Sequence, residues 1–246
     1  MIRLIKDADD VLGNNVFACK IRSNMLSYGE CPFMFTWAQN SDTYIQKFSN
    51  SLTISTGENT DYEELKSFIN TIGFDTVFTD MTTAEKFGLN IIDGGTIMKL
   101  KDFVPTYFDT HTQIVYPEYK IIYKLLKMLE FPLPNYDMFL TDFSHRVRHN
   151  SARVVSDNTY TSVAFTAWED KHSAVISAVA VTPQIRHTGQ GSKVLQSLCH
   201  LLLKDKRDIY LYRRLDTLEE FYNKNGFYNV GLYVTATKGT DNEYNV

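Results

Sequence analysis

The segment from residue 178 to residue 192 has the clearest chemical pattern in the sequence. An apolar run, Ala178–Val181, is followed by Pro183 and then by Gly189 and Gly191, just before a leucine-rich stretch. Glycine allows positive φ angles and a close approach between backbone and ligand. Amide groups at a helix start point outward, and the helix dipole favours anions there. The pattern predicts a strand, a tight loop and a helix whose first turn binds paired phosphates.

Two side chains of this loop add to the same chemistry. Ser192 supplies a hydroxyl donor and Arg186 a fixed positive charge. The loop differs from the two commoner phosphate-binding loops. A P-loop requires Gly-Lys-Ser/Thr, whereas Lys193 follows the serine here. A Rossmann loop requires three glycines and a later acidic residue, whereas this loop has two glycines and the next predicted strand leads into Arg213 and Arg214.

The hydrophobic pattern predicts the elements around this loop. Alternating apolar residues predict strands before it, and a helical period of apolar residues predicts a helix after it. Pro117 is a favoured first-turn residue for an earlier helix. The predicted elements are helices 118–129 and 136–143, strands 152–156, 162–168 and 173–181, helix 192–203, strand 209–212, helix 218–225 and strand 230–235.

The first half has a comparable mixture of elements. Thr60 and Asp61 can cap a helix, and Gly73 predicts its end. The predicted elements are helix 9–28, strands 33–38 and 44–55, helix 61–72, strand 76–79, helix 83–87 and strand 97–100. Proline interrupts regular structure, and four of the six prolines lie between residues 105 and 134. We therefore expect an N-terminal domain at 1–104, a linker at 105–116 and a second domain at 117–246.

The composition excludes several classes of protein. The 246 residues suffice for two small domains, and their apolar (43%) and charged (22%) fractions are those of globular proteins. A net charge of −4 argues against a broad basic surface for nucleic acid. Three scattered cysteines form no C-x-x-C pair, which argues against a disulfide scaffold or a zinc site. Without an apolar signal or membrane segment, we expect a cytoplasmic protein with no metal and neither nucleic acid nor membrane as a partner.

Two motifs together resemble those of the GNAT (GCN-five-related N-acetyltransferase) superfamily. Arg186, Gly189 and Gly191 fill the pattern Gln/Arg-x-x-Gly-x-Gly/Ala. About 30 residues later, the stretch from Tyr222 to Phe227 is similar to Tyr-x-x-x-Gly-Phe. The resemblance covers most of residues 150–235.

The resemblance implies a site for acetyl-CoA between two splayed parallel strands, 173–181 and 209–212. It implies that backbone groups of the first strand pair with pantetheine and hold the thioester oxygen, while the loop holds the pyrophosphate. Tyr222 matches the residue that donates a proton to the leaving thiolate. The implied binding residues are Val179, Ala180, Val181, Arg186, His187, Thr188, Gly189, Gln190, Gly191 and Ser192.

The sequence also departs from the family pattern. Many members carry a glutamate on the strand before the loop as general base, but strand 173–181 contains no acidic residue. The acceptor amine then loses its proton through water or to another side chain. The candidates are Glu169, Asp170 and His172, or Asp142, His145 and His149. An Asn that often precedes the family's Tyr is replaced by Leu215, beside Asp216, and Arg213 and Arg214 are candidates for the CoA 3′-phosphate.

Residues 142–149 are similar to a stretch in some bacterial two-part GNAT proteins. The stretch contains two histidines and two arginines, with His145 and His149 on one helical face. This spacing permits a metal site, but no third ligand is obvious. A hydrogen-bonding role at the surface or between domains, or a role in acceptor binding, are the other interpretations.

The order helix, strand, short helix, strand occurs in both halves, at residues 61–100 and 192–235. This order suggests a diverged internal duplication. The first copy has no phosphate loop, because Glu58 and Asp61 stand before its helix and would repel pyrophosphate. We expect this half to line the acceptor pocket or to form a homodimer interface.

These observations predict a mixed α+β protein. Its C-terminal domain would have a mostly antiparallel GNAT-type sheet flanked by helices, and its N-terminal α/β domain would be a degenerate copy. The expected activity is acetyl transfer from acetyl-CoA to a primary amine of a small molecule or peptide. The alternative is a non-catalytic acyl-CoA-binding or regulatory module. No motif identifies the acceptor.

Overall fold

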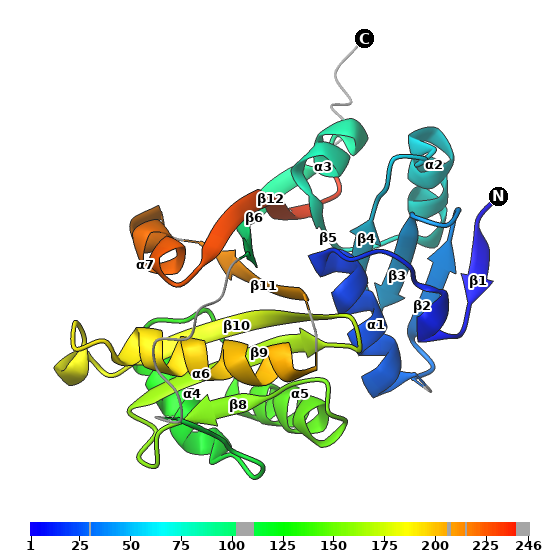
Figure 1. Ribbon diagram of the computed structural model, residues 1–246. Helices are drawn as coiled ribbons and strands as arrows, with labels where there is room; N and C mark the ends of the chain where they lie inside the picture. The colour runs from blue at the N-terminus through cyan, green and yellow to red at the C-terminus, as the bar shows by residue number, and fades with distance from the viewer. Residues whose placement is uncertain (30, 102–110, 206–207, 215, 240–246) are drawn as a thin grey trace. The chain divides into compact units, whose positions relative to one another are not determined.

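The computed structural model describes residues 1–29, 31–101, 111–205, 208–214 and 216–239 (Figure 1). The chain divides into two compact units, one formed by residues 1–97 with the chain from residue 230 onward, the other by residues 98–229. Residues 105–110 of the predicted linker lie outside the described residues. No helix in the described part of the chain has the length and apolar character needed to cross a membrane.

The second unit contains a mostly antiparallel sheet. Its strands are β7 (Thr112–Gln113), β8 (Val154–Ser156), β9 (Ser162–Glu169), β10 (Ser173–Val181) and β11 (Asp208–Arg213). They lie in the order β11-β10-β9-β8-β7, and each printed pairing is antiparallel except that of β10 with β11. The last residues of β6 (Asn90–Leu100) and the first of β12 (Phe227–Thr237) also belong to this unit.

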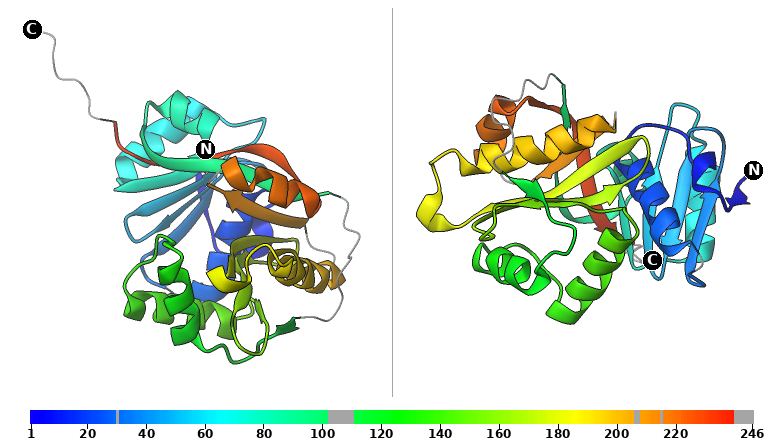
Figure 2. Two further views of the ribbon diagram at one scale, coloured as in Figure 1. Left: turned by 90° about the vertical axis from the view of Figure 1, so that its left-hand side faces the viewer. Right: turned by 60° about the horizontal axis from the view of Figure 1, so that its bottom comes forward.

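Helices cover both faces of this sheet (Figure 2, right). One face packs on α4 (Tyr119–Met128) and α5 (Tyr136–Arg148), through a core that includes Phe143 and Phe165. The other face packs on α6 (Gln190–Lys204), whose Leu198 is fully buried. The short helix α7 (Glu219–Lys224) precedes β12. The predicted leucine-rich helix is confirmed, while the two-residue strand β7 had no pattern from which to predict it.

The first unit repeats this arrangement. Its strands are β1 (Arg3–Ile5), β2 (Met34–Ala38), β3 (Tyr44–Phe48), β4 (Ser51–Ser55) and β5 (Thr76–Asp80), and its helices are α1 (Val16–Tyr28), α2 (Tyr62–Ile72) and α3 (Met81–Phe87). Strands β2, β3 and β4 pair antiparallel and β4 pairs parallel with β5, as β8, β9, β10 and β11 do. In each unit a helix connects the two parallel strands, so the predicted repetition of elements is confirmed.

Two predictions for the first half are wrong in detail. Predicted helix 9–28 is broken, because Gly13 adopts a φ of 98° and α1 starts only after the capping residue Asn15. Predicted strand 44–55 is a hairpin of β3 and β4 that turns at Ser49, which has a φ of 54°. A non-glycine residue in the left-handed region gives no strong turn pattern in the sequence.

The end of the chain differs from the predicted domain division. Residues 230–237 of β12 were expected in the second domain, but they pair antiparallel with β5, from Tyr233 opposite Asp80 to Ala236 opposite Val77. The first unit therefore receives its last strand from the far end of the chain. Local sequence patterns predict a strand but not its partner.

Burial along α6 predicts how stability depends on this helix. Leu198→Ala should lower the free energy of unfolding by about 2–5 kcal/mol, because it removes methyl groups from a closed core. Leu203→Ala on the same helix is the matched control, since Leu203 is 37% exposed and should cost under about 1 kcal/mol. Chemical denaturation measures both. Equal losses for the two variants would contradict the packing described here.

Candidate functional site

Strands β10 and β11 pair along only part of their length. The register runs from Ser173 opposite Asp208 to Ile176 opposite Leu211, although β10 continues to Val181. The predicted separation of two parallel strands is therefore present. From Ser177 to Val181, the backbone of β10 does not pair with β11.

A bulge at Ser177 accompanies this separation. The pairing of β10 with β9 shifts register on both sides of Ile176, and Ser177 is exposed between buried neighbours. The shift reverses the faces of the strand: Ile176 and Val179 pack in the core under α6, whereas Ala178 belongs to the core under α4 and α5. A bulge bends its strand and increases the local twist. It thus explains why β10 leaves β11 at this point.

The predicted phosphate loop follows the separated end of β10. A short 3-10 turn, Pro183–Ile185, leads to His187 and Gly189, which have φ angles of 62° and 84°. Gly189 then caps α6 without any side-chain hydrogen bond. Left-handed residues next to right-handed ones turn successive backbone amides toward one concave side, where anions can bind.

The amides at the start of α6 have no acceptor among the described residues. In this loop, backbone hydrogen bonds start from the amides of Ile185, Arg186 and Lys193, and none starts from residues 188–192. The loop is exposed from Arg186 to Gly189 and half-buried from Gln190 to Ser192. Unsatisfied helix-start amides are bonded by water or by a ligand. This loop therefore meets the geometric requirement of an anion site.

Side chains of the loop mostly stabilise its own shape. The Arg186 Nε donates to the Val181 carbonyl at 3.4 Å, and the Thr188 hydroxyl donates to the Ile185 carbonyl at 2.7 Å. Ser192 lies on the first turn of α6, where its hydroxyl oxygen accepts from Asn225. The predicted binding residues thus lie at the end of β10 (179–181) and in the loop and first turn of α6 (186–192), and their binding roles stay predictions.

Helix α7 packs against this loop. A Cβ added at Gly191 would lie 3.3 Å from the Phe221 ring and 3.8 Å from the Val181 side chain. Glycine is therefore favoured at Gly191 by this close packing, whereas at Gly189 it is favoured by the positive φ. The ring of Phe221, which precedes the predicted acid Tyr222, thus packs against one side of the loop.

Tyr222 lies in the core of the second unit. Its side chain is 8% exposed, and its ring packs edge-on against Phe221 and Phe227, with centroids 5.0 and 6.2 Å away. Burial raises the pKa of Tyr222 to about 12. The phenol is therefore neutral at physiological pH, as a proton donor must be. Its catalytic role stays a prediction.

The carboxylates considered as general bases are engaged in structure. Glu169 is 1% exposed, lies 3.0 Å from the Arg153 Nε and accepts from the Thr166 hydroxyl at 2.6 Å. Asp170 accepts from the amides of His172 and Ser173 at 2.5 and 2.7 Å. These groups close the β9–β10 hairpin, at the opposite end of β10 from the phosphate loop.

Residues 142–148 form the last part of α5, and His149 is its C-terminal cap. Asp142 and Arg146 make an ion pair at 3.0 Å, and the rings of His145 and His149 lie in contact, tilted by 38° with centroids 4.1 Å apart. Within the described ranges, no three His, Cys, Asp or Glu side chains gather to hold a metal ion. The contacts of Asp142 and the His pair described here lie within one helix.

The two candidates for the 3′-phosphate differ in surroundings. Arg213 is buried and pairs with Asp216 at 2.8 Å and with Glu219 at 3.4 Å, which fixes the turn into α7. Arg214 is exposed. Leu215, at the position of the family's Asn, lies outside the described residues. The charge of Arg213 is therefore used within the chain.

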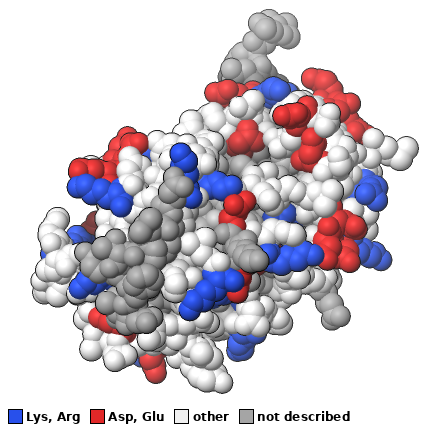
Figure 3. Space-filling view, viewed as in Figure 1, with Lys and Arg blue, Asp and Glu red and all other residues white. Residues whose placement is uncertain are grey.

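The loop between β4 and α2 is the counterpart of the predicted phosphate loop in the first unit, and most of its amides are satisfied within the chain. Asp61 accepts from the amides of Glu63 and Glu64 at 3.1 Å each. The amides of Gly57, Asn59 and Asp61 donate to Thr60, Asp42 and Gln39. Acidic side chains also gather over α2 and α3, at the upper right of Figure 3. Charge and hydrogen bonding both disfavour an anion at this loop.

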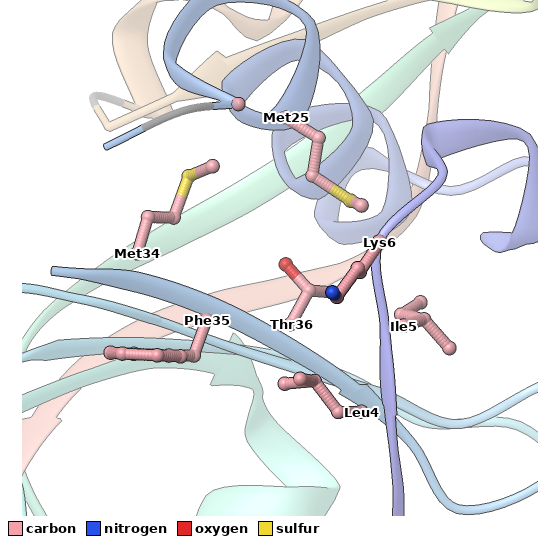
Figure 4. Close-up of a pocket in the computed structure, with 8 residues that line it drawn as sticks. Leu4, Ile5, Lys6, Met25, Met34, Phe35 and Thr36 are labelled. Carbon is pink, nitrogen blue, oxygen red and sulfur yellow. The ribbon is translucent and has the colours of Figure 1, made fainter. Parts of the chain in front are cut away.

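A separate cavity of about 340 Å³ lies in the first unit (Figure 4). Its lining includes Lys6, Met25, Met34 and Phe35. None of the residues that sequence motifs indicated lines it. The residues predicted to bind acetyl-CoA lie in the second unit.

The fold is that of GNAT acetyltransferases. A tandem GNAT protein from the clavulanic acid biosynthesis pathway is similar in structure, with a TM-score of 0.57 at 11% identity over 98% of this chain and 99% of that one. A GNAT-family acetyltransferase from Colwellia psychrerythraea gives 0.58 at 9% identity, over 97% and 100%. No family model matches the sequence, and no curated protein matches it. The predicted resemblance is thus confirmed for the fold.

Sequence reasoning missed two residues of the site. Ser177 marks the bulge, and Asn225 connects α7 to α6 through hydrogen bonds to Ser192 and from Gln196. Asn225 lies inside the Tyr-x-x-x-Gly-Phe motif, at a position the motif leaves open. Both roles depend on contacts between elements, which no local pattern encodes.

Proposed function

We propose that the second unit binds acetyl-CoA at the opening between β10 and β11 and transfers its acetyl group to a primary amine of a small molecule or peptide. The observation that carries this proposal is the start of α6. Its amides from Thr188 to Ser192 have no acceptor in the described chain, and they lie where β10 has left β11. The GNAT fold supports acyl transfer as the general activity.

The two parts of the opening suit different parts of the ligand. The amides of the loop would hold the pyrophosphate, because a helix start favours negative charge. The backbone from Ser177 to Val181 is outside the ladder with β11, so the amide groups of pantetheine can pair with it as an added strand would. This arrangement would place the thioester near the bulge.

The reaction requires no covalent intermediate with the protein. The amine nitrogen attacks the thioester carbon, and the carbonyl electron pair moves to oxygen. A backbone N–H of β10 would stabilise that oxyanion. As the tetrahedral intermediate collapses, the C–S bond breaks and the sulfur leaves with the bonding electrons. Tyr222 would donate its hydroxyl proton toward that sulfur.

A raised pKa changes how Tyr222 would act. A phenol with a pKa of about 12 is a weaker acid than a thiol, whose ordinary pKa is about 8.5. Full proton transfer to a free thiolate would therefore be unfavourable. Instead, a strong hydrogen bond from the Tyr222 hydroxyl to the sulfur would stabilise the negative charge that develops while the C–S bond breaks. Water would take the proton that the attacking amine loses.

A regulatory acyl-CoA-binding module is the second candidate. It is favoured by the absence of an acid on β10 and by the engagement of Glu169 and Asp170 in structural contacts. In either case, we place the protein in the cytoplasm, since its three cysteines are free thiols. The first unit would supply a wall of the acceptor pocket or a homodimer interface.

Gln190→Glu tests the anion site. A carboxylate on the first turn of α6 stabilises the helix by about 0.3–1 kcal/mol but repels a diphosphate. We expect the Kd for CoA to rise at least about tenfold in calorimetry, with an unchanged or higher Tm. Asn135→Asp is the matched control, because it makes the same change at the cap of α5. If neither variant changes the Kd, the loop does not bind the diphosphate.

Tyr222→Phe tests the proposed acid. The substitution keeps the buried ring and removes only the hydroxyl, so kcat should fall about 10²-fold or more while the Kd for acetyl-CoA stays within about twofold. Tyr228→Phe, at an exposed position nearby, should leave kcat unchanged. Thiol release with a panel of amines gives the rates. Binding of acetyl-CoA without turnover of any amine would favour the regulatory module.

The pKa of Tyr222 determines the alkaline pH above which the rate should fall. Because burial raises this pKa to about 12, the phenol keeps its proton throughout the range from pH 7 to 10. The rate should therefore rise with pH as the amine loses its proton, with no fall up to pH 10. A fall centred near pH 8 or 9 in the wild type, absent in Tyr222→Phe, would contradict the buried state of this group.

A single site per chain follows from the comparison of the two loops. Calorimetric titration with CoA should give one molecule bound per chain, because side chains already satisfy the amides at the start of α2. A stoichiometry near two would show that the first unit has kept a site.

A further inference from the structure

We propose that Asn225 is a positioning residue that directs the Ser192 hydroxyl toward the diphosphate. This inference rests on the proposed function, because it concerns the same loop. Asn225 follows α7 and is 5% exposed. Its side chain connects α7 with the first turn of α6, where the unsatisfied amides lie.

The hydrogen bonds of Asn225 fix the orientation of its amide. Its Nδ2 donates to the Phe221 carbonyl at 2.8 Å, and a carbonyl can only accept. The same nitrogen donates to the Ser192 hydroxyl oxygen at 3.1 Å, and Oδ1 accepts from Gln196 Nε2 at 3.1 Å. A flipped amide would lose the bond to Phe221 and the bond from Gln196. The nitrogen must therefore face Ser192.

This orientation determines what Ser192 can do. A hydroxyl has one proton to donate and two lone pairs that accept. Since Asn225 donates to the oxygen, the hydroxyl proton must point elsewhere. Among the described residues, no group accepts it. Ser192 therefore offers a further donor beside the amides of residues 188–192, and Asn225 keeps this donor from turning back into the protein.

Asn225 also connects the loop to the proposed acid. Its bond to the Phe221 carbonyl holds the helix that carries Tyr222, and the Phe221 ring packs against Gly191. One buried amide thus fixes the first turn of α6 against α7. If Asn225 had only a structural role, it would stabilise α7, and its effect on binding would not depend on the Ser192 hydroxyl.

A double-mutant cycle separates the two roles. The variants are Ser192→Ala, Asn225→Ala and the double variant, and calorimetry with CoA gives the Kd of each. We expect each single variant to raise the Kd about fivefold to tenfold. In the Ser192→Ala background, Asn225→Ala should raise it less than about twofold further. Asn223→Ala, on the exposed side of α7, is the matched control and should leave the Kd unchanged.

A second variant covers the case in which Asn225→Ala does not fold. Gln196→Met keeps the side-chain length and removes the donor to the Asn225 oxygen. It should raise the Kd about twofold to threefold, and only when Ser192 is present. An Asn225 effect that persists in full without the hydroxyl, or no effect at all, would overturn the positioning role.

Wild-type binding distinguishes this inference from the proposed function. If wild-type protein binds no CoA, the proposed function fails and this inference fails with it. If wild-type protein binds CoA and Gln190→Glu weakens that binding, the anion site stands. The Asn225 cycle then decides the positioning role alone.

Discussion

The candidate site depends on the point where β10 and β11 cease to pair. After Ile176, the bulge at Ser177 reverses the faces of β10, so that Ala178 packs toward α4 and α5 while Val179 packs toward α6. Each half of the strand still buries its apolar side chains, yet the strand bends away from its neighbour. A continuous parallel ladder would leave no open backbone before the loop. The opening is therefore built into the sheet itself.

The two units satisfy the amides of their equivalent helix starts in opposite ways. Before α2, the chain uses its own groups, with Asp61 and Asp42 accepting from amides and Gln39 and Thr60 completing the set. Before α6, glycine takes the cap position and no side chain accepts. Helix-start amides need partners in either case. The same strand pairing thus gives a closed turn in one unit and, in the other, a turn whose helix-start amides have no acceptor among the described residues.

Sequence patterns predicted correctly the features that a single continuous segment of the chain defines. The loop and α6 follow from two glycines, a proline and a helical period of leucines, and the structure places them as predicted. The pairing of β12 with β5, the bulge at Ser177 and the bonds of Asn225 could not be predicted in this way. Each is defined by a partner distant in sequence. The prediction of one continuous strand over residues 44–55 was wrong for a different reason, because a serine at position 49 gives no strong turn pattern.

The missing acid on β10 has a consequence for the acceptor. The carboxylates nearest in sequence, Glu169 and Asp170, hold the β9–β10 hairpin, at the opposite end of β10 from the loop. A reaction without a protein base proceeds only through the neutral fraction of the amine. At pH 7 that fraction is about 10–15% for an α-amino group with a pKa near 7.8, but below about 0.1% for a lysine side chain with a pKa near 10.4. With water as the proposed acceptor of the proton, the site would favour amines of low basicity.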